Sequence, residues 1–164
     1  MNISAEPHLR VSIADQRLTL LSAEGDALGS WPVSTARNGP GERLGSGCTP
    51  RGRHAIRACI GGDRPGNAVF VGRRWTGEIY SSELAERFPE RDWILTRILW
   101  LSGLEPGFNR YGETSTGRRY IYIHGSPDEG VDGTPASHGC IRMKTADILE
   151  LYPRVRAGIQ VSIE

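Results

Sequence analysis

Lysine is nearly absent from this chain, since Lys144 is the only one among its 20 basic residues. This scarcity argues against a lysine nucleophile or a Schiff-base enzyme. The net charge is only +1, which gives no electrostatic case for a nucleic-acid partner. No apolar run approaches the roughly 18 residues of a membrane helix, so we expect no membrane association.

A secretory signal is also missing, because the N-terminal MNISAEPHLR lacks a basic stretch followed by an apolar one. We therefore expect a cytoplasmic protein; a periplasmic one would require that a signal peptide had been removed. Only three cysteines are present, Cys48, Cys59 and Cys140, and an odd number without a signal indicates free thiols. In an exported protein Cys48 and Cys59 could pair, which would still leave Cys140 single.

The remaining composition is typical of a globular protein. The 164 residues are 38% hydrophobic and 24% charged, enough for a single domain, residues 1–164, to bury a core without disulfides. The 21 glycines and 10 prolines favour many turns between short strands. We therefore predict a mostly β fold with one or two short helices.

Strands are predicted from alternating or short apolar runs. Leu9 to Ile13 and the pattern around Leu18 and Leu20 predict a hairpin. ILTRILWL is compatible with a strand or a buried helix, but its length and the following Gly103 favour a strand. The other predicted strands cover residues 28–34, 53–59 and 159–164.

Two short helices are predicted. SSELAERF has a Ser N-cap, a Glu83–Arg87 pair and Pro89 as a stop. TADILELY has Thr145 as its cap, an apolar side of Ile148, Leu149 and Tyr152, and Pro153 at its end.

Three segments give weaker patterns. The glycine-rich loop 38–52 matches neither a dinucleotide fingerprint nor a phosphate-binding loop, which would need a lysine. Residues 60–95 show no clear pattern outside the short helix. Residues 103–119 form a long polar loop of the kind that is usually functional or mobile.

YIYIHG is the clearest strand. A period of two places Tyr120, Tyr122 and His124 on one face, and Ile121 and Ile123 on the other. We expect the isoleucines to face the core and His124 to lie on the opposite, polar face.

TPASHGCIRM, residues 134–143, carries the chemically most suggestive residues. A catalytic Cys140 would need an imidazole to take its proton and backbone N–H groups to hold an oxyanion. His138, two positions away, and His124, at the end of the strand, are the candidates for the base. Gly125 and Gly139 leave room for close backbone approach, and Gly139 suits a loop whose amides converge.

Three other interpretations stay open on these residues alone. Cys140 could be an inert small hydrophobe, and both histidines could be structural. His124, His138 and Cys140 could also bind zinc, with a fourth ligand from the carboxylates of residues 128–132. The chain lacks the paired C-x-x-C or H-x-x-x-H units that normally preorganise zinc, which argues against a metal.

The segment IHGSPDEGVDGTPASHGCIRM resembles the signature of the YkuD-type L,D-transpeptidase family. That signature has a His-Gly pair, a spacer, then a small residue, His-Gly-Cys, an aliphatic residue and Arg or Asn. The corresponding residues here are His124, Gly125, Ser137, His138, Gly139, Cys140, Ile141 and Arg142. CTPRGRHAI, residues 48–56, resembles the TPxGxxxI segment of the family, and the first hairpin is similar too.

The resemblance implies a flattened β-barrel or sandwich with the cysteine at the end of a tunnel, and a cofactor-free reaction. Cys140 would attack a carbonyl with His124 as base, oriented by the Gly125 carbonyl, and the amides around His138, Gly139 and Cys140 would form the oxyanion hole. The substrate-binding residues expected are Arg142, Ser137 and Tyr122. Arg142 would anchor either the loop or a substrate carboxylate, with a structural salt bridge as the alternative, and for Tyr122 plain packing is the alternative.

The implied substrate is a peptidoglycan tetrapeptide stem, cleaved between the L-centre of a diamino acid and D-Ala. Water as acceptor would make the protein an L,D-carboxypeptidase, whereas an amine acceptor would form 3→3 crosslinks. With a cytoplasmic location expected, we favour a carboxypeptidase that trims muropeptides in murein recycling. A non-catalytic wall-peptide binding module has no need of both Cys140 and His124, and no pattern in the chain indicates an oligomeric state.

Overall fold

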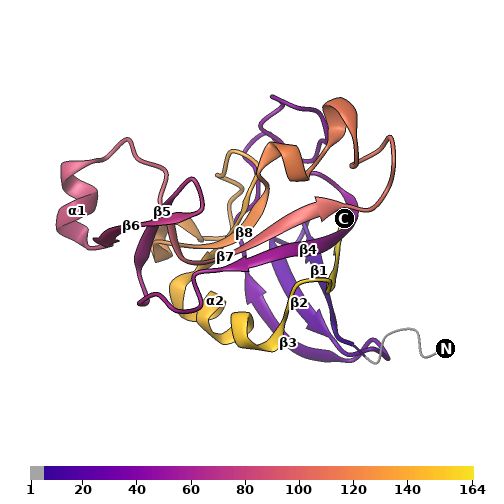
Figure 1. Ribbon diagram of the computed structural model, residues 1–164, viewed down its shortest axis with the longest axis horizontal. Coiled ribbons are helices and arrows are strands. Elements are labelled where there is room, and N and C mark those ends of the chain that lie inside the picture. The colour runs from indigo at the N-terminus through magenta and orange to yellow at the C-terminus, as the bar shows by residue number, and fades with distance from the viewer. Residues whose placement is uncertain (1–5) are drawn as a thin grey trace.

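The computed structural model describes residues 6–164 as a curled β-sheet half-barrel with two short α-helices (Figure 1). The mostly β fold with short helices predicted from the sequence is confirmed. The strands are β1 (His8–Ser12), β2 (Arg17–Leu21), β3 (Ala27–Pro32), β4 (Gly52–Ile60), β5 (Ala68–Val71), β6 (Arg74–Ile79), β7 (Ile94–Gly103), β8 (Tyr122–Ser126), β9 (Ile141–Lys144) and β10 (Gln160–Ile163). The helices are α1 (Ser82–Arg87), α2 (Thr145–Leu151) and the 3-10 turns η1 (Gly112–Thr114), η2 (Gly117–Arg119), η3 (Asp128–Gly130) and η4 (Tyr152–Arg154).

The strand order is β3-β2-β1-β10-β4-β7-β5-β6, and β8 and β9 branch from β7. Most neighbours are antiparallel; β1 with β10 and β8 with β9 are parallel. The curl brings β9 back to the other end of the sheet. There Ser34, just after β3, exchanges two backbone hydrogen bonds with Arg142, of 3.0 and 2.9 Å.

The first hairpin forms as its alternation predicts. Leu9 lies opposite Leu20 and Val11 opposite Leu18, and all four side chains are buried. They belong to the main core, which also contains Ile121, Ile123, Ile141 and Met143 from β8, β9 and the residues before β8. The two isoleucines of YIYIHG therefore face the core, as expected.

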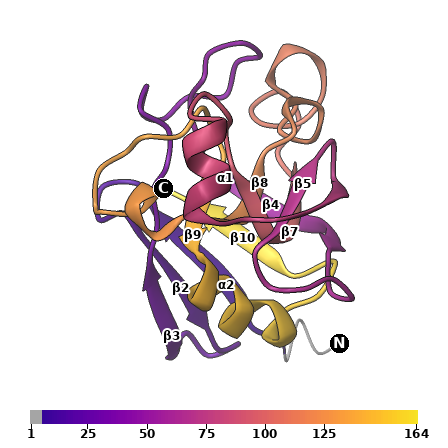
Figure 2. The same cartoon turned by 90° about the vertical axis from the view of Figure 1, so that its left-hand side faces the viewer.

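Helix α2 follows β9 directly and packs on β7, β8 and β9 (Figure 2). The prediction of Thr145 as its cap is wrong: Lys144 is the N-cap, and Thr145 begins the helix. The Thr145 hydroxyl instead contacts Asn67 and Thr96. Ile148 is buried as predicted, but Leu149 is exposed and Leu151 takes the second core position, because the helix lies on its i, i+3 side.

Residues 60–95 form a second, smaller layer. The β5–β6 hairpin and α1 lie together at the left of Figure 1. Ser81 caps α1 as predicted, with its side chain accepting from the Leu84 amide at 3.1 Å, and the helix ends before Pro89. Phe70 of β5 packs against Ile98 and Tyr122, so this layer covers one face of β7 and β8.

This second layer gives the YIYIHG strand an environment different from the one expected. Tyr122 and His124 were predicted on a polar face, but both are buried, because the second layer lies over that face. Tyr120 was predicted within the strand and instead ends η2 in the left-handed region, with φ 54°. Its side chain is 53% exposed, and β8 begins two residues later.

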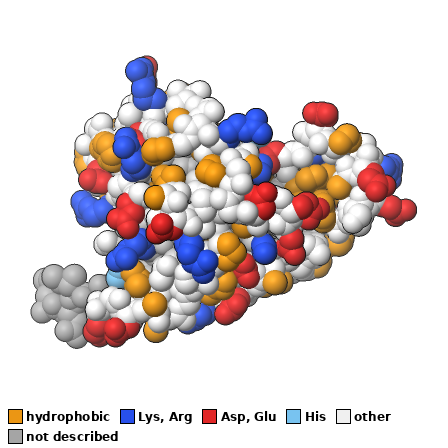
Figure 3. Space-filling view, turned by 180° about the vertical axis from the view of Figure 1, so that it is seen from behind, with side chains coloured by type: hydrophobic (Ala, Val, Ile, Leu, Met, Phe, Trp, Pro, Cys, Tyr) orange, Lys and Arg blue, Asp and Glu red, His pale blue; other side chains and the backbone are white. Residues whose placement is uncertain are grey.

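Charged side chains of both signs are interspersed over the face seen in Figure 3, in keeping with a net charge of +1. Within residues 6–164, none of the helices combines the length and apolar character that a membrane span requires.

Candidate active site

The parallel register of β8 and β9 assembles the site. Ile123 lies opposite Ile141 and His124 opposite Arg142. Because side chains alternate between faces, Tyr122, His124, Cys140 and Arg142 all point away from the main core. Two segments that are distant in the sequence thus place a thiol and an imidazole on one face.

Cys140 lies on this face and is half-buried. Its Sγ accepts a hydrogen bond from the Tyr122 amide at 3.3 Å and donates to the Tyr120 carbonyl at 3.5 Å. It also packs against the apolar cluster that contains Tyr122 and Trp100. Backbone groups before and at the start of β8 therefore hold the sulfur in place.

His124 is held by its own neighbour in the chain. Nδ1 lies 2.6 Å from the Gly125 carbonyl oxygen. A carbonyl only accepts, so Nδ1 carries the proton and Nε2 presents its lone pair. Nε2 has no hydrogen-bond partner among residues 6–164, although the ring as a whole is buried.

Close packing explains why residue 125 is glycine. A Cβ built there would lie 2.5 Å from the Leu95 carbonyl oxygen and 3.0 Å from Thr96 Cβ. The approach arises from a bulge in β7, where the register shifts after Leu95 and Thr96 has φ 76°. The bulge packs β7 closely against Gly125. This packing fixes the backbone at Gly125, whose carbonyl orients His124.

Burial favours the neutral form of both reacting groups. Burial raises the pKa of Cys140 to about 11, with the Tyr122 amide acting in the opposite direction. Burial lowers the pKa of His124, and the Gly125 carbonyl partly offsets this effect. No hydrogen bond joins His124 to Cys140 among the described residues, so the thiol proton is transferred during attack rather than beforehand.

The loop before Cys140 is tied into a fixed shape. Ser137 Oγ donates to the Cys140 carbonyl at 2.5 Å and accepts from the Gly139 amide at 3.1 Å. Thr49 Oγ1 donates to the Gly139 carbonyl at 2.9 Å, and Ser137 is paired through its backbone with residues 35 and 37. Thr49 belongs to the CTPRG segment, so that second family-like motif supports the cysteine loop.

Gly139 has a backbone that other residues rarely adopt, with φ 137°. A Cβ there would lie 3.1 Å from Ile121 Cδ1 and 3.2 Å from the Cys48 carbonyl oxygen. Its amide is already used by Ser137, whereas those of His138 and Cys140 have no partner within residues 6–164. These two amides are therefore the available donors for an oxyanion.

The His138 imidazole lies at the surface beside Asp92 and makes no hydrogen bond to the thiol. Its side chain is 83% exposed, and Nδ1 lies 3.7 Å from Asp92 Oδ2. The zinc alternative requires His124, His138 and Cys140 to converge, and residues 6–164 contain no group of three or more His, Cys, Asp or Glu placed to hold a metal. Residue 138 thus contributes to the site through its backbone.

Arg142 is paired with a carboxylate that the sequence did not indicate. Its Nη2 lies 3.1 Å from Asp92 Oδ1, and the Arg142 side chain is only 15% exposed. Asp92 lies in the patternless segment before β7, so no sequence signal connects it with the site. It raises the pKa values of His124 and Cys140, whereas Arg142 lowers them.

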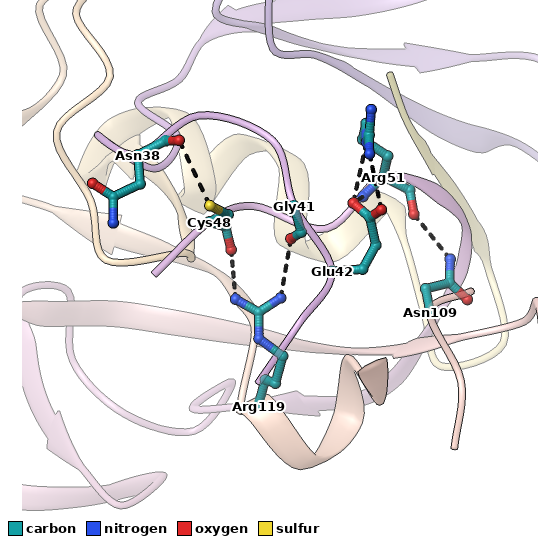
Figure 4. Close-up of polar contacts among 7 residues, drawn as sticks. All are labelled: Asn38, Gly41, Glu42, Cys48, Arg51, Asn109 and Arg119. Atoms are coloured by element: carbon teal, nitrogen blue, oxygen red, sulfur yellow. Dashed lines mark hydrogen bonds and ion pairs between the residues drawn. The ribbon is translucent and has the colours of Figure 1, made fainter. Parts of the chain in front are cut away.

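Arg119 is a second residue that sequence reasoning missed. Its guanidinium donates to the carbonyls of Cys48 at 2.6 Å and Gly41 at 3.2 Å, which clamps the glycine-rich loop (Figure 4). Nη2 also lies 3.7 Å from the position of a Gly139 Cβ, and Arg119 lowers the pKa of Cys140. Cys48 therefore contacts the site through its backbone carbonyl. Its Sγ lies 3.6 Å from the carbonyl oxygens of Asn38 and Ser46.

The structure thus brings together Cys140, His124, Gly125 and the backbone of residues 137–140. Tyr122 and Arg142 lie on the same face. Ser137 is buried and both contacts of its hydroxyl are within the loop, so a role in substrate binding stays a prediction. All three cysteines are free thiols in this structure.

Solved structures with the same fold are similar over almost the whole chain. An L,D-transpeptidase from Xylanimonas cellulosilytica is 17% identical at a TM-score of 0.57, covering 100% of this chain and 63% of that one. L,D-transpeptidase 3 from Mycobacterium tuberculosis, in complex with a faropenem-derived adduct, is 14% identical at 0.58, covering 96% and 60%. Bd1075 of Bdellovibrio bacteriovorus is 15% identical at 0.60, covering 100% and 49%.

This chain accordingly spans less than two thirds of the length of these solved chains. No curated protein matches it. The family model of the L,D-transpeptidase catalytic domain, YkuD, matches residues 6–163. The chain therefore belongs to the YkuD family of L,D-transpeptidase catalytic domains.

Proposed function

We propose that the protein is an L,D-carboxypeptidase that removes the terminal D-Ala from peptidoglycan tetrapeptide stems. Cys140 Sγ attacks the carbonyl of the L-centre while His124 Nε2 takes the thiol proton. The C–N bond then breaks, and the imidazolium returns its proton to the leaving amine of D-Ala. Water next attacks the thioester with His124 as base, which releases the tripeptide and restores the thiol.

The observation that carries the proposal is the arrangement of one accessible thiol, one oriented imidazole and two unpaired amides. The tautomer set by Gly125 leaves Nε2 as a base. The amides of His138 and Cys140 have no partner within residues 6–164, which supports the role of oxyanion donors that the family resemblance implies.

The charges around the thiol support water as the acceptor. Arg119 and Arg142 lower the pKa of the Cys140 thiol, and the one carboxylate that acts on it, Asp92, is already paired with Arg142. Arg57 and Arg73 stack on Trp100 at 4.1 and 4.7 Å in the cluster against which Cys140 packs, and neither they nor Arg119 pair with a carboxylate among residues 6–164. Such surroundings disfavour an incoming ammonium group more than a neutral water molecule.

A transpeptidase that forms 3→3 crosslinks is the second candidate, because the matching family and the solved relatives are described as L,D-transpeptidases. It would use the same acyl-enzyme and differ only in the acceptor. The two candidates are therefore separated by products rather than by the acylation machinery.

The test is to incubate the purified protein with a disaccharide-tetrapeptide and to follow the products by mass spectrometry. We expect loss of one alanine without a dimer, over a range of substrate concentrations that supply acceptor amine. A crosslinked dimer as the main product would contradict the carboxypeptidase assignment. Cys140→Ala should abolish both products, and a chelator-treated sample should keep full activity.

The cellular setting is part of the proposal. We place the enzyme in the cytoplasm, acting on muropeptides in murein recycling. Cell fractionation with an antibody tests the location, and accumulation of tetrapeptide muropeptides in a strain lacking the gene tests the recycling role. Enzyme found only in the periplasmic fraction would contradict this placement.

A further inference from the structure

An arginine without an acidic partner among residues 6–164 contacts the two tyrosines whose backbones hold the reactive thiol. Arg73 occupies the two-residue turn between β5 and β6, where Gly72 has φ 56° and Arg73 itself has φ 64°. A non-glycine residue in this region is uncommon, so the turn fixes the start of the side chain at a conformational cost. The turn projects Arg73 from the second layer toward β8.

Aromatic rings then fix the guanidinium. Arg73 Cζ lies 4.7 Å from the centroid of the Trp100 ring and 4.9 Å from that of Tyr120. Nη1 donates to Tyr122 Oη at 3.0 Å. Stacking on ring faces leaves the edge of a guanidinium, which carries its N–H donors, free to bind a ligand.

The two tyrosines that hold Arg73 are the same residues that contact the nucleophile. The Tyr122 amide and the Tyr120 carbonyl are the two hydrogen-bond partners of Cys140 Sγ. Their rings extend from these contacts to the guanidinium. Arg73 is therefore about one tyrosine side chain away from the sulfur, within reach of a peptide whose scissile carbonyl lies at Cys140.

Two arginines on the Tyr122 and His124 face, Arg142 and Arg73, differ in their partners. Arg142 is largely buried and paired with Asp92, so its charge is already balanced. Arg73 has the neutral Tyr122 hydroxyl as its one side-chain hydrogen-bond partner within residues 6–164, which uses one of its five N–H donors. A half-buried, oriented and unbalanced guanidinium is well suited to a bidentate carboxylate.

We propose that Arg73 binds a carboxylate on one of the two residues that flank the scissile bond of the stem peptide, and that it sets the preference of the site for acidic stem peptides. This inference rests on the proposed function and replaces Arg142 by Arg73 as the residue that receives substrate charge. Two carboxylates lie on the residues that flank the scissile bond: the terminal carboxylate of D-Ala and the second carboxylate of a diaminopimelate residue. The test below separates them.

The experiment compares wild type with Arg73→Gln, Arg73→Lys and the control Arg74→Gln. Arg74 is the next residue of the same hairpin and is exposed, so its substitution removes the same charge without touching the rings. Each enzyme is assayed on the free tetrapeptide, on its C-terminal amide, and on a peptide with lysine in place of diaminopimelate. Thermal unfolding confirms that each variant is folded.

We expect Arg73→Gln to raise KM for the free tetrapeptide by about tenfold or more, with kcat changed far less, because a charge-assisted hydrogen bond is lost. Arg73→Lys should recover only part of this loss, and Arg74→Gln should match wild type. One of the two altered peptides should show no further loss in Arg73→Gln, and that peptide identifies the carboxylate.

An equal loss in Arg73→Gln on all three peptides, or an equal loss in Arg74→Gln, would overturn the proposal. Calorimetric binding of the three peptides to Cys140→Ala, with and without Arg73→Gln, gives a readout that does not depend on turnover. If wild type does not cleave the tetrapeptide but binding still depends on Arg73 and one carboxylate, only the proposed function fails. If binding does not depend on Arg73, this inference fails whatever the turnover.

Discussion

The carbonyl oxygen of Gly125 lies 2.6 Å from Nδ1 of His124, the residue immediately before it. A backbone carbonyl thus takes the orienting role that a carboxylate has in a Ser-His-Asp triad. A carbonyl holds the same tautomer without a full negative charge, which agrees with an imidazole whose pKa stays below its usual value. Residue 125 can do this because it has no side chain to separate β8 from β7.

Gly125→Ala should therefore damage both folding and catalysis. The new Cβ would lie 2.5 Å from the Leu95 carbonyl oxygen, a backbone atom that cannot move alone. We expect a loss of about 1–3 kcal/mol in the free energy of unfolding, as for other overpacked sites, and a larger drop in kcat than in binding. Gly66→Ala is the control, since a Cβ there meets only Leu149 Cδ1 at 3.7 Å. Equal unfolding midpoints in denaturant for the two variants would contradict this packing argument.

The pH profile of kcat/KM should have an acid limb but no alkaline limb from the thiol near neutrality. His124 must be neutral to act as base, and its pKa lies below the usual 6.5, so activity falls as the pH drops through that lowered value. The thiol, with a pKa of about 11, stays protonated over the same range. A limb rising through pH 8 to 9 would instead indicate that a preformed thiolate is the reacting species.

Asp92→Asn should move that acid limb further down. The Asp92 carboxylate favours the charged imidazolium, so its removal lowers the pKa of His124 again. It also disfavours the thiolate, so alkylation of Cys140 by iodoacetamide should begin at lower pH in the variant. The measurements are the pH dependence of kcat/KM and of the alkylation rate. An acid limb that moves upward would contradict the assigned direction.

Ser137→Ala should lower kcat with a modest loss of stability. The substitution leaves the Cys140 carbonyl and the Gly139 amide without the partner that shapes the loop. A lost buried hydrogen bond costs about 1–3 kcal/mol. Ser30→Ala, on the exposed side of β3, is the matched control. A variant with normal kcat and raised KM would support the alternative that Ser137 binds substrate.

His54 should make the fold sensitive to acid independently of catalysis. It is buried, with Nδ1 on the Gly52 carbonyl and Nε2 on Thr116 Oγ1, and burial lowers its pKa from 6.5 to about 4. As the pH falls, His54 is therefore protonated near pH 6.5 in the unfolded chain but only near pH 4 in the folded chain. The free energy of unfolding decreases as the pH falls through this window, because the unfolded state binds the additional proton. The loss reaches about 3 kcal/mol.

The measurement is urea unfolding of wild type and His54→Gln at pH 7.5 and pH 4.5. The glutamine variant should be less stable at pH 7.5 but should lose less stability on acidification. His124 titrates in the same direction in both proteins and cancels in the comparison. An equal loss in the two proteins would show that His54 is not the sensitive group.

Local patterns in the sequence predict the strands that face the main core. Alternation at residues 9–13 and 18–20, and the isoleucines of YIYIHG, are satisfied by burial in one cluster. The environment of the opposite face was not predictable, because it depends on the β5–β6 hairpin, whose short strands carry no regular alternation. The Thr145 cap failed for a related reason: the Thr145 hydroxyl contacts Asn67 and Thr96, which are distant in the sequence.

The same distinction applies to the site. Cys140, His124 and Gly125 were predictable because their spacing on a strand and a following loop follows a family pattern. Asp92, Arg119 and Arg73 act through contacts with residues 50, 71 and 49 positions away. No local pattern marks such contacts. His138, two positions before Cys140, was one candidate base in the sequence, yet its imidazole lies beside Asp92.

The central claim is that Cys140 forms an acyl-enzyme with the stem peptide. Rapid acid quench of the protein with a tetrapeptide, followed by intact-protein and peptide mass spectrometry, tests it most directly. We predict a transient species heavier by the tripeptide acyl group, located on Cys140, that decays as tripeptide appears. Release of D-Ala by Cys140→Ala, or release by wild type with no adduct on Cys140 at any time, would contradict the account.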